Sequence, residues 1–164
     1  RIMSISYHDI QAFLYREARL LDEREWDEWL TLYHKKAEFW MPCWDDDDTL
    51  TGDPNSEISL IYYPNREGLE DRVYRIKTER SGASTPEPRT THQITNIEVM
   101  KEEGDSLEVR FNWHTLSHRY KQTDSYFGVS FYTLDVSGDS PLISRKKVQL
   151  NNDYIHQVID VYHI

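Results

Sequence analysis

Hydrophobic and polar residues alternate through Leu107–Tyr120, LEVRFNWHTLSHRY. A period of two is typical of a β-strand, because successive side chains point to opposite faces. One face has the composition of a protein core and consists of Leu107, Val109, Phe111, Trp113 and Thr115. The other face is too polar for a core and too aromatic for ordinary surface, and it holds Asn112, His114, Leu116, His118 and Tyr120. The pattern predicts a strand whose second face lines either a pocket or a subunit interface.

Two helices are predicted before this strand. Ser6 and Asp9 have the spacing of a capping box, which satisfies free amides at the start of a helix. The apolar stripe that follows at helical spacing comprises Ile10, Phe13, Leu14, Ala18 and Leu21. Asp22 followed by Glu25 repeats the capping signal. A second, shorter amphipathic helix is therefore predicted, marked by Trp26, Trp29, Leu30 and Tyr33.

The rest of the chain predicts short strands, one more helix and a meander. Ala37–Met41 and Ile58–Tyr63 have strand composition, and Arg66–Arg80 has a helical apolar stripe. Five further strands, separated by turn sequences, are predicted at His92–Met100, Leu107–Tyr120, Tyr126–Val136, Leu142–Leu150 and Tyr154–Ile164. Helices followed by a long antiparallel sheet indicate an α+β fold. Strands this long must curl, so the sheet is expected to form a cone over the helices, and the cavity of that cone is either open or filled.

The last predicted strand, Tyr154–Ile164, differs from an exposed edge strand because both of its faces are apolar or aromatic. Such a strand is either central to its sheet or covered by another chain.

Composition narrows the possible classes of protein. The length of 164 residues predicts a single domain spanning residues 1–164. The 29 acidic residues exceed the 19 basic ones for a net charge of −10, which disfavours nucleic acid and anionic membranes as partners. The sequence contains no apolar run long enough to span a membrane and no apolar signal segment at its start, so a cytoplasmic protein is expected. Cys43 is the only cysteine, which excludes a cluster or disulfide built from several cysteines of this chain.

Metal binding by this chain is disfavoured. On a strand, His114 and His118 would lie roughly 13 Å apart, too far to share one ion. The acidic run Asp45–Asp48 lacks the spaced carboxylates, the glycine and the terminal glutamate of an EF-hand loop, so a solvated turn is expected there. No metal ligand, cofactor-binding residue or catalytic residue is assigned to the chain.

Three groups of residues remain as candidates for function. An acid/base set inside the cone would draw on Asp124, His92, His114, Tyr120 and Tyr126. If the cone is open, the residues expected to line it are His114, His118, Tyr120 and Tyr126. The residues expected near a subunit interface are Arg145, Lys146, Lys147, Tyr154 and His156. An alternative interpretation of Arg145, Lys146 and Lys147 is a solvated strand edge, where lysines are common.

Four segments resemble the small β subunit of bacterial aromatic-ring-hydroxylating dioxygenases, closest to the benzoate and toluate 1,2-dioxygenase group. They are FLYREARLLDEREWDEWLTLYHKKAEFWMP, RTTHQITNIEV, NWHTLSHRY and RKKVQLNNDYIHQVIDVYHI. The resemblance covers essentially the whole chain. It implies the cone-shaped α+β fold shared with scytalone dehydratase, ketosteroid isomerase, nuclear transport factor and cystatin-like proteins.

The resemblance also implies an α3β3 oxygenase in which the two kinds of subunit have different roles. The large α subunit would carry a Rieske [2Fe-2S] cluster and a mononuclear Fe(II), while NADH would be used by a separate reductase. This chain would be a non-catalytic structural subunit that contacts α and other β subunits. A Rieske centre needs two cysteines and two histidines, so Cys43 alone cannot supply it. Two alternatives stay open: a self-sufficient cone-fold dehydratase or isomerase that uses His, Asp and Tyr residues in its cavity, and a small-molecule binding module.

Overall fold

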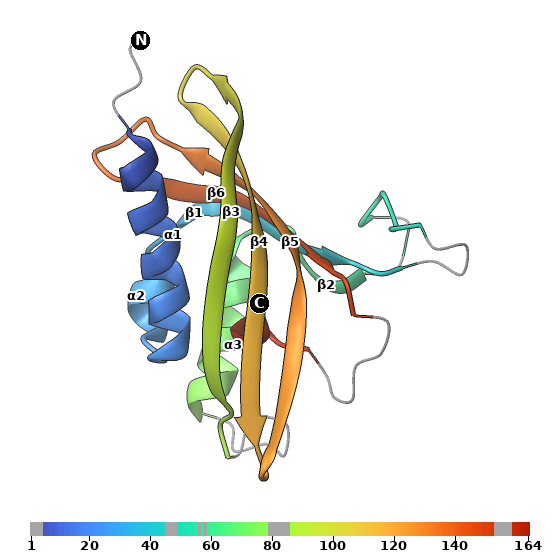
Figure 1. Cartoon of the computed structure of the whole chain (residues 1–164). Coiled ribbons are helices and arrows are strands. Elements are labelled where there is room, and N and C mark those ends of the chain that lie inside the picture. The colour runs from blue at the N-terminus through green and yellow to red at the C-terminus, as the bar shows by residue number, and fades with distance from the viewer. Residues whose placement is uncertain (1–4, 45–48, 56, 58, 79–85, 153–158) are drawn as a thin grey trace.

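The computed structural model describes residues 5–44, 49–55, 57, 59–78, 86–152 and 159–164. Six strands form one curled sheet in the order β2-β1-β6-β5-β4-β3 (Figure 1). Their bounds are β1 Tyr33–Pro42, β2 Ser59–Tyr63, β3 Arg89–Glu103, β4 Ser106–Arg119, β5 Gln122–Asp135 and β6 Leu142–Leu150. Every neighbouring pair is antiparallel except β1 and β6, which are parallel. The predicted α+β class with a curled sheet is confirmed. Strand β1 lies between β2 and β6, and its pairing with β6 is the parallel one.

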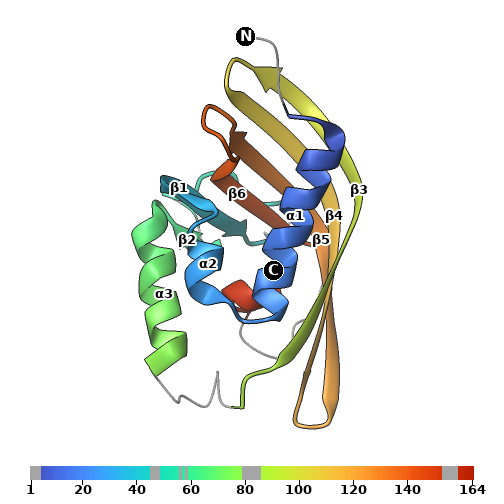
Figure 2. The ribbon, with the colours of Figure 1, turned by 90° about the vertical axis from the view of Figure 1, so that its left-hand side faces the viewer.

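Three helices cover one side of the sheet: α1 (Tyr7–Asp22), α2 (Trp26–Leu30) and α3 (Arg66–Thr78) (Figure 2). We call the side of the sheet that they cover the inner face and the opposite side the outer face. The predicted capping box is present, because Ser6 Oγ accepts from the Asp9 amide at 3.1 Å and the Asp9 carboxylate accepts from the Ser6 amide at 3.1 Å. Helix α1 therefore begins where the polar pattern indicates, and its apolar stripe is buried.

The core fills the space between the helices and the inner face. The alternation on β4 is confirmed, with Leu107, Val109, Phe111, Trp113 and Thr115 all buried. The largest fully buried side chains include Trp29, Tyr33, Tyr126, Phe39 and Phe111. Aromatic rings of this size bury 150–250 Å² each, so a few of them occupy much of a small cone.

The prediction that Asp22 and Glu25 cap the second helix is wrong. Glu25 stands at the N-cap of α2 and makes no side-chain capping hydrogen bond. The Asp22 carboxylate instead accepts from Thr90 Oγ1 and from the His92 amide on β3, at 3.0 Å each. Tyr33, expected at the end of the second helix, begins β1. A carboxylate at the end of α1 thus joins the helix to the sheet.

The prediction of a final strand over Tyr154–Ile164 is wrong for the part of it that the structure describes. Val161–His163 form a 3₁₀ helix, η1, whose N-cap residue Asp160 accepts from the Val161 amide at 2.8 Å. Residues 153–158 lie outside the described residues. The buried residues of the end segment are Ile159, Val161, Tyr162, His163 and Ile164. The described part of the segment packs into the core as a short helical turn, which buries its apolar side chains.

A two-residue turn joins β4 and β5. Tyr120 and Lys121 have positive φ values of 55° and 63°, and Arg119 pairs with Gln122. Two residues with positive φ form the tight turn that matches the twist of a hairpin. β5 therefore starts earlier than the predicted Tyr126, and Tyr120 projects from the tip with 67% of its surface exposed.

Candidate functional site

Glu17 of α1 lies at the centre of a buried polar cluster. Its Oε2 accepts from Tyr33 OH at 2.5 Å, from Trp29 Nε1 at 3.1 Å and from Lys146 Nζ at 3.1 Å. Its Oε1 accepts from Tyr132 OH at 2.5 Å. Glu17 is 2% exposed and Lys146 is 0% exposed. Helix α1 supplies the carboxylate, and β1, β6, β5 and α2 supply the donors.

The surroundings of this cluster hold Glu17 and Lys146 as an ion pair. Burial alone raises the pKa of Glu17, but Lys146 and the Tyr132, Tyr33 and Trp29 donors outweigh burial and leave that pKa below its usual value. Burial lowers the pKa of Lys146, while Glu17 opposes the change. Burial, and then the charge of Glu17, raise the pKa of both tyrosines well above 10, so both stay protonated donors. Each polar side chain of this cluster is therefore engaged by another member of the cluster.

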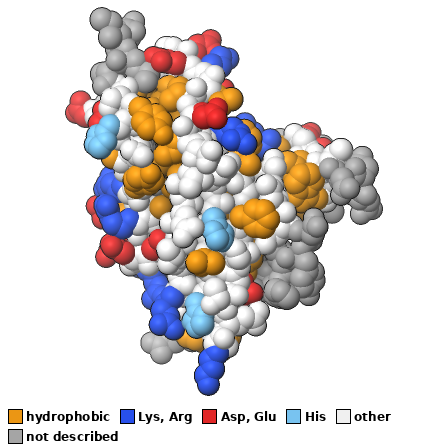
Figure 3. Space-filling model, viewed as in Figure 1, with side chains coloured by type: hydrophobic (Ala, Val, Ile, Leu, Met, Phe, Trp, Pro, Cys, Tyr) orange, Lys and Arg blue, Asp and Glu red, His pale blue; other side chains and the backbone are white. Residues whose placement is uncertain are grey.

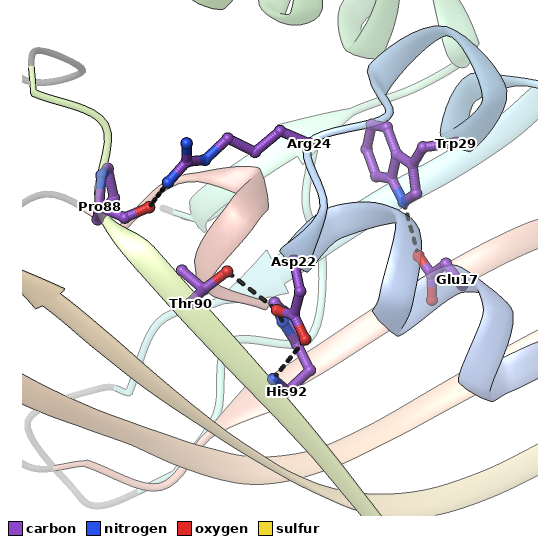
Figure 4. A network of polar contacts seen from close by, with 7 residues as sticks. All are labelled: Glu17, Asp22, Arg24, Trp29, Pro88, Thr90 and His92. Atoms are coloured by element: carbon purple, nitrogen blue, oxygen red, sulfur yellow. Dashed lines mark hydrogen bonds and ion pairs between the residues drawn. The ribbon is translucent and has the colours of Figure 1, made fainter.

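A second polar cluster fixes the end of α1 to β3 (Figure 4). Asp22 Oδ1 lies 2.5 Å from His92 Nδ1 and accepts from Thr90 Oγ1 at 3.0 Å. Nearby, Arg24 Nη2 donates to the Pro88 carbonyl at 3.1 Å. The side chain of His92 is 6% exposed. Two hollows adjoin this cluster: one of about 10 Å³, lined in part by Arg24, Pro88 and Thr90, and an open groove of about 330 Å³, lined in part by Asp22 and His92. The smaller hollow accommodates about one water molecule and is far too small for an aromatic acid.

The proposed acid/base set does not converge. His92 and Tyr126 lie on the inner face, both in register with Thr115 of β4. Asp124 lies near the hairpin tip and accepts from Gln122 Nε2 at 3.0 Å. His114 lies on the outer face, and Tyr120 projects from the hairpin tip. Tyr126 packs instead against His163, with ring centroids 5.0 Å apart. Sequence reasoning missed the roles of Glu17, Asp22 and His163. Glu17 stands at a polar helix position, Asp22 has the spacing of a helix cap, and His163 lies in a segment predicted as a strand.

The prediction that His114, His118 and Tyr120 line a cavity is wrong. His114 contacts Ser125 Oγ at 2.6 Å and Gln93 Oε1 at 3.2 Å, both on the outer face. His118 Nδ1 lies 2.7 Å from Thr123 Oγ1 on the same face. The strand alternation that buries Trp113 and Thr115 turns these histidines away from the helices. Tyr126 does face inward, at 2% exposure, where it is packed as part of the core.

The residues predicted near an interface divide between the two faces of β6. Arg145 and Lys147 lie on the outer face beside Trp40, with the Arg145 guanidinium carbon 5.6 Å and Lys147 Nζ 4.9 Å from its ring centroid. Lys146 lies on the inner face and is fully buried, so the prediction that it meets a partner is wrong. Tyr154 and His156 fall outside the described residues.

The part of the chain that the structure describes contains no group of three or more His, Cys, Asp or Glu side chains placed to hold a metal ion. Cys43 is half-buried and forms no disulfide bond. The Asp45–Asp48 run lies outside the described ranges. Within those ranges no helix is both long and apolar enough to cross a membrane. The donor set needed for a Rieske cluster or a mononuclear iron is therefore not assembled by the described residues.

A curled sheet with helices on its inner face places this chain in the class of cystatin-like folds. An NTF2-like protein with a cystatin-like fold from Novosphingobium aromaticivorans shares that fold, with a TM-score of 0.63 and 13% identity over 90% of this chain and 82% of that chain. The profile of the family described as "Ring hydroxylating beta subunit" matches residues 16–157. The chain belongs to this ring-hydroxylating β-subunit family.

Three relatives share its full length. The 2-halobenzoate 1,2-dioxygenase small subunit of Burkholderia cepacia is 63% identical, over 97% of this chain and 96% of that protein. The toluate 1,2-dioxygenase subunit beta of Pseudomonas putida is 57% identical, over 99% of this chain and 100% of that protein. The crystal structure of the benzoate 1,2-dioxygenase β subunit from Burkholderia mallei has a TM-score of 0.85 and 58% identity, over 99% of this chain and 100% of that one. The recognition made from the four sequence segments is confirmed.

Proposed function

We propose that this chain is the structural β subunit of the terminal oxygenase of a benzoate or toluate 1,2-dioxygenase-type enzyme. In this proposal, the chain forms a single domain in an α3β3 hexamer in the cytoplasm. The large subunit holds the Rieske [2Fe-2S] cluster and the mononuclear iron, and a separate reductase delivers electrons from NADH. The oxygenase cis-dihydroxylates an aromatic acid at the large subunit.

The observation that carries the proposal is the closed Glu17–Lys146 cluster in a filled cone, in a chain 57–63% identical to small subunits of such enzymes. A cone-fold dehydratase would need an open cavity with an acid and a base directed into it. Here the interior carboxylate is engaged by four donors, Trp29, Tyr33, Tyr132 and Lys146. The role of the chain is then to present a rigid surface to its partners.

The test is co-purification of a tagged copy expressed together with the large subunit during growth on benzoate. A coloured complex of several hundred kilodaltons, whose iron–sulfur absorption follows the larger chain, is expected. That complex should consume oxygen with benzoate, NADH and the reductase, whereas the isolated chain should be colourless and inactive. A colourless homo-oligomer that leaves the large subunit unbound would refute the proposal.

A further inference from the structure

Strand β1 joins the main part of the sheet through its pairing with β6. Strands β3 to β6 form one antiparallel unit, and β1 extends that unit, with β2 beyond it. The ladder between β1 and β6 shifts in register between Tyr33 and Glu38, and it pairs Phe39 with Lys146. A register shift disrupts the backbone ladder locally, so side chains also have to define how far β1 lies along β6.

Hydrophobic burial does not define that position. Ala37, Phe39 and Met41 of β1 all belong to the core and are fully buried. Side chains alternate between faces with a period of two, so a slip of two residues keeps each of them on the same face. Such a slip would exchange one buried apolar side chain for another. The apolar pattern therefore specifies which face of β1 points inward, but not the position of β1 along β6.

The Glu17–Lys146 cluster, by contrast, depends on that position. Tyr33 OH of β1 and Lys146 Nζ of β6 both donate to Glu17 Oε2, at 2.5 and 3.1 Å. One oxygen atom of α1 therefore binds a side chain from each strand of the parallel pair. A slip of two residues would move Tyr33 by roughly 6.6 Å along the strand, beyond hydrogen-bond reach of that oxygen. The carboxylate would lose a donor, and the buried hydroxyl would lose its acceptor.

The polar contact between β1 and β6 on the outer face is less selective. Arg145 Nε donates to Glu38 at 2.7 Å, and the two side chains are 45% and 29% exposed. Lys147 lies two positions further along the same face of β6, so a slip in that direction would bring Glu38 opposite another cation. Figure 3 shows hydrophobic and cationic side chains mixed over this side of the molecule. An exposed ion pair also contributes little, because water replaces a lost partner.

We propose that the Glu17–Lys146 cluster is a register key, which holds β1 at one position along β6. A buried ion pair is weak evidence for stability, because apolar side chains of similar volume often replace it without loss. Its best-attested role is to select one pairing among several of similar energy, as a single buried polar residue does in coiled coils. The same alignment places Glu38 opposite Arg145 on the outer face. The key inside the sheet therefore determines which side chains of the two strands are neighbours on its outside.

The test traps the alignment of β1 with pairs of introduced cysteines, in a chain whose single native cysteine is replaced by Cys43→Ser. Glu38→Cys with Arg145→Cys joins two positions that are paired in the ladder. Glu38→Cys with Lys147→Cys joins positions that lie roughly 8 Å apart at Cα in this alignment, from the strand spacing and rise, which is beyond the span of a disulfide. It forms readily only after a slip of two residues. Copper phenanthroline is the oxidant, and mass spectrometry of the peptides measures the rate of each cross-link.

Tyr33→Phe and Tyr132→Phe are the matched core variants. Each removes one buried hydroxyl that donates to Glu17 at 2.5 Å, but Tyr33 belongs to β1 and Tyr132 to β5. Tyr33→Phe should raise the rate of the slipped cross-link, between positions 38 and 147, at least tenfold. Tyr132→Phe should leave that rate unchanged, because it removes a donor without releasing β1.

Thermal unfolding of each variant is followed by circular dichroism, so that lost stability is separated from altered alignment. If Tyr33→Phe does not fold, its combination with Glu17→Gln removes the same contact without leaving a charge short of a donor, and it should give the same increase. If the slipped cross-link keeps its original rate in a folded variant that lacks the Tyr33 hydroxyl, the cluster does not set the alignment. If Tyr132→Phe raises the rate as much as Tyr33→Phe does, the cluster acts only through general stability and the inference is overturned.

Discussion

Asp22 at the end of α1 and His92 on β3 are 70 positions apart in sequence, yet their side chains are in contact. The Asp22 carboxylate lies 2.5 Å from His92 Nδ1 and accepts a hydrogen bond from the His92 backbone amide at 3.0 Å.

Replacing Asp22 with Ala should lower the free energy of unfolding by about 2–3 kcal/mol, because hydrogen bonds to a charged group are lost in a part-buried site. Urea denaturation measures the change. Asp27→Ala, which removes only an exposed ion pair with Lys77, should cost less than about 1 kcal/mol. Equal losses in the two variants would show that the contact contributes nothing specific.

The Glu17–Lys146 pair provides a second prediction. Lys146→Met removes the ammonium group and leaves a buried carboxylate without its counter-charge, so we expect a loss of about 3–5 kcal/mol in the free energy of unfolding. Adding Glu17→Gln to that variant should recover much of the loss, since no unpaired buried charge remains. A double-mutant cycle in urea measures the coupling. Additive losses in the two single variants would contradict an ion pair at this site.

His163 should make stability depend on pH. Burial is the main cause that lowers the pKa of His163 from 6.5 to about 4 in the folded chain. Between these values the unfolded chain binds more protons than the folded one, so stability rises with pH and is lost as the pH falls from about 6.5 to about 4. The whole shift corresponds to about 3 kcal/mol.

The variant His163→Gln retains a side-chain acceptor for the Asp160 amide, which donates to His163 Nδ1 at 2.9 Å in the wild type. Its free energy of unfolding should change less with pH over the same range, because the group that titrates is gone. Urea denaturation at intervals between pH 4 and pH 7 gives the two slopes. Identical slopes would show that His163 does not carry this dependence.

Gly128 of β5 lies opposite Leu150, against the backbone of β6. A Cβ added at Gly128 would fall 1.8 Å from the Gln149 carbonyl oxygen, so the backbone would have to move. Gly128→Ala should therefore lower the free energy of unfolding by about 1–3 kcal/mol or more. Gly138→Ala is the control, because the nearest heavy atom there is 3.9 Å from the added Cβ. Thermal unfolding of the two variants should differ clearly, and equal midpoints would contradict the tight contact.

Local patterns predicted most of the fold. The period of two on β4 and the capping box at Ser6 and Asp9 are properties of neighbouring residues, so sequence carries them directly. The bounds predicted for Leu142–Leu150 match β6. The parallel pairing of β1 with β6 was not predictable in this way, because it depends on strands that are far apart in the chain.

The functional features were harder to predict because they depend on which face a side chain occupies in three dimensions. Arg145, Lys146 and Lys147 read as one basic cluster, but the strand turns the middle residue into the core beside Glu17. Hydrophobicity on both sides of the end segment suited a central strand and a buried helical turn equally well, and η1 proved to be the latter. His114 and His118 share a face as predicted, but periodicity does not tell which face the helices will cover.

The parallel pairing also constrains how the chain folds. Glu38 of β1 and Arg145 of β6 are hydrogen-bonded although 107 positions separate them. Strands β3 to β6 follow one another as hairpins and need only short loops to pair, whereas β1 must wait for β6 before it gains its neighbour. Contacts between distant residues slow folding, because loop closure costs entropy before the contact forms. During synthesis on the ribosome, β1 and β2 therefore cannot join the rest of the sheet until β6 has emerged, and the contact of Trp40 on β1 with Lys147 on β6 forms only at that late stage.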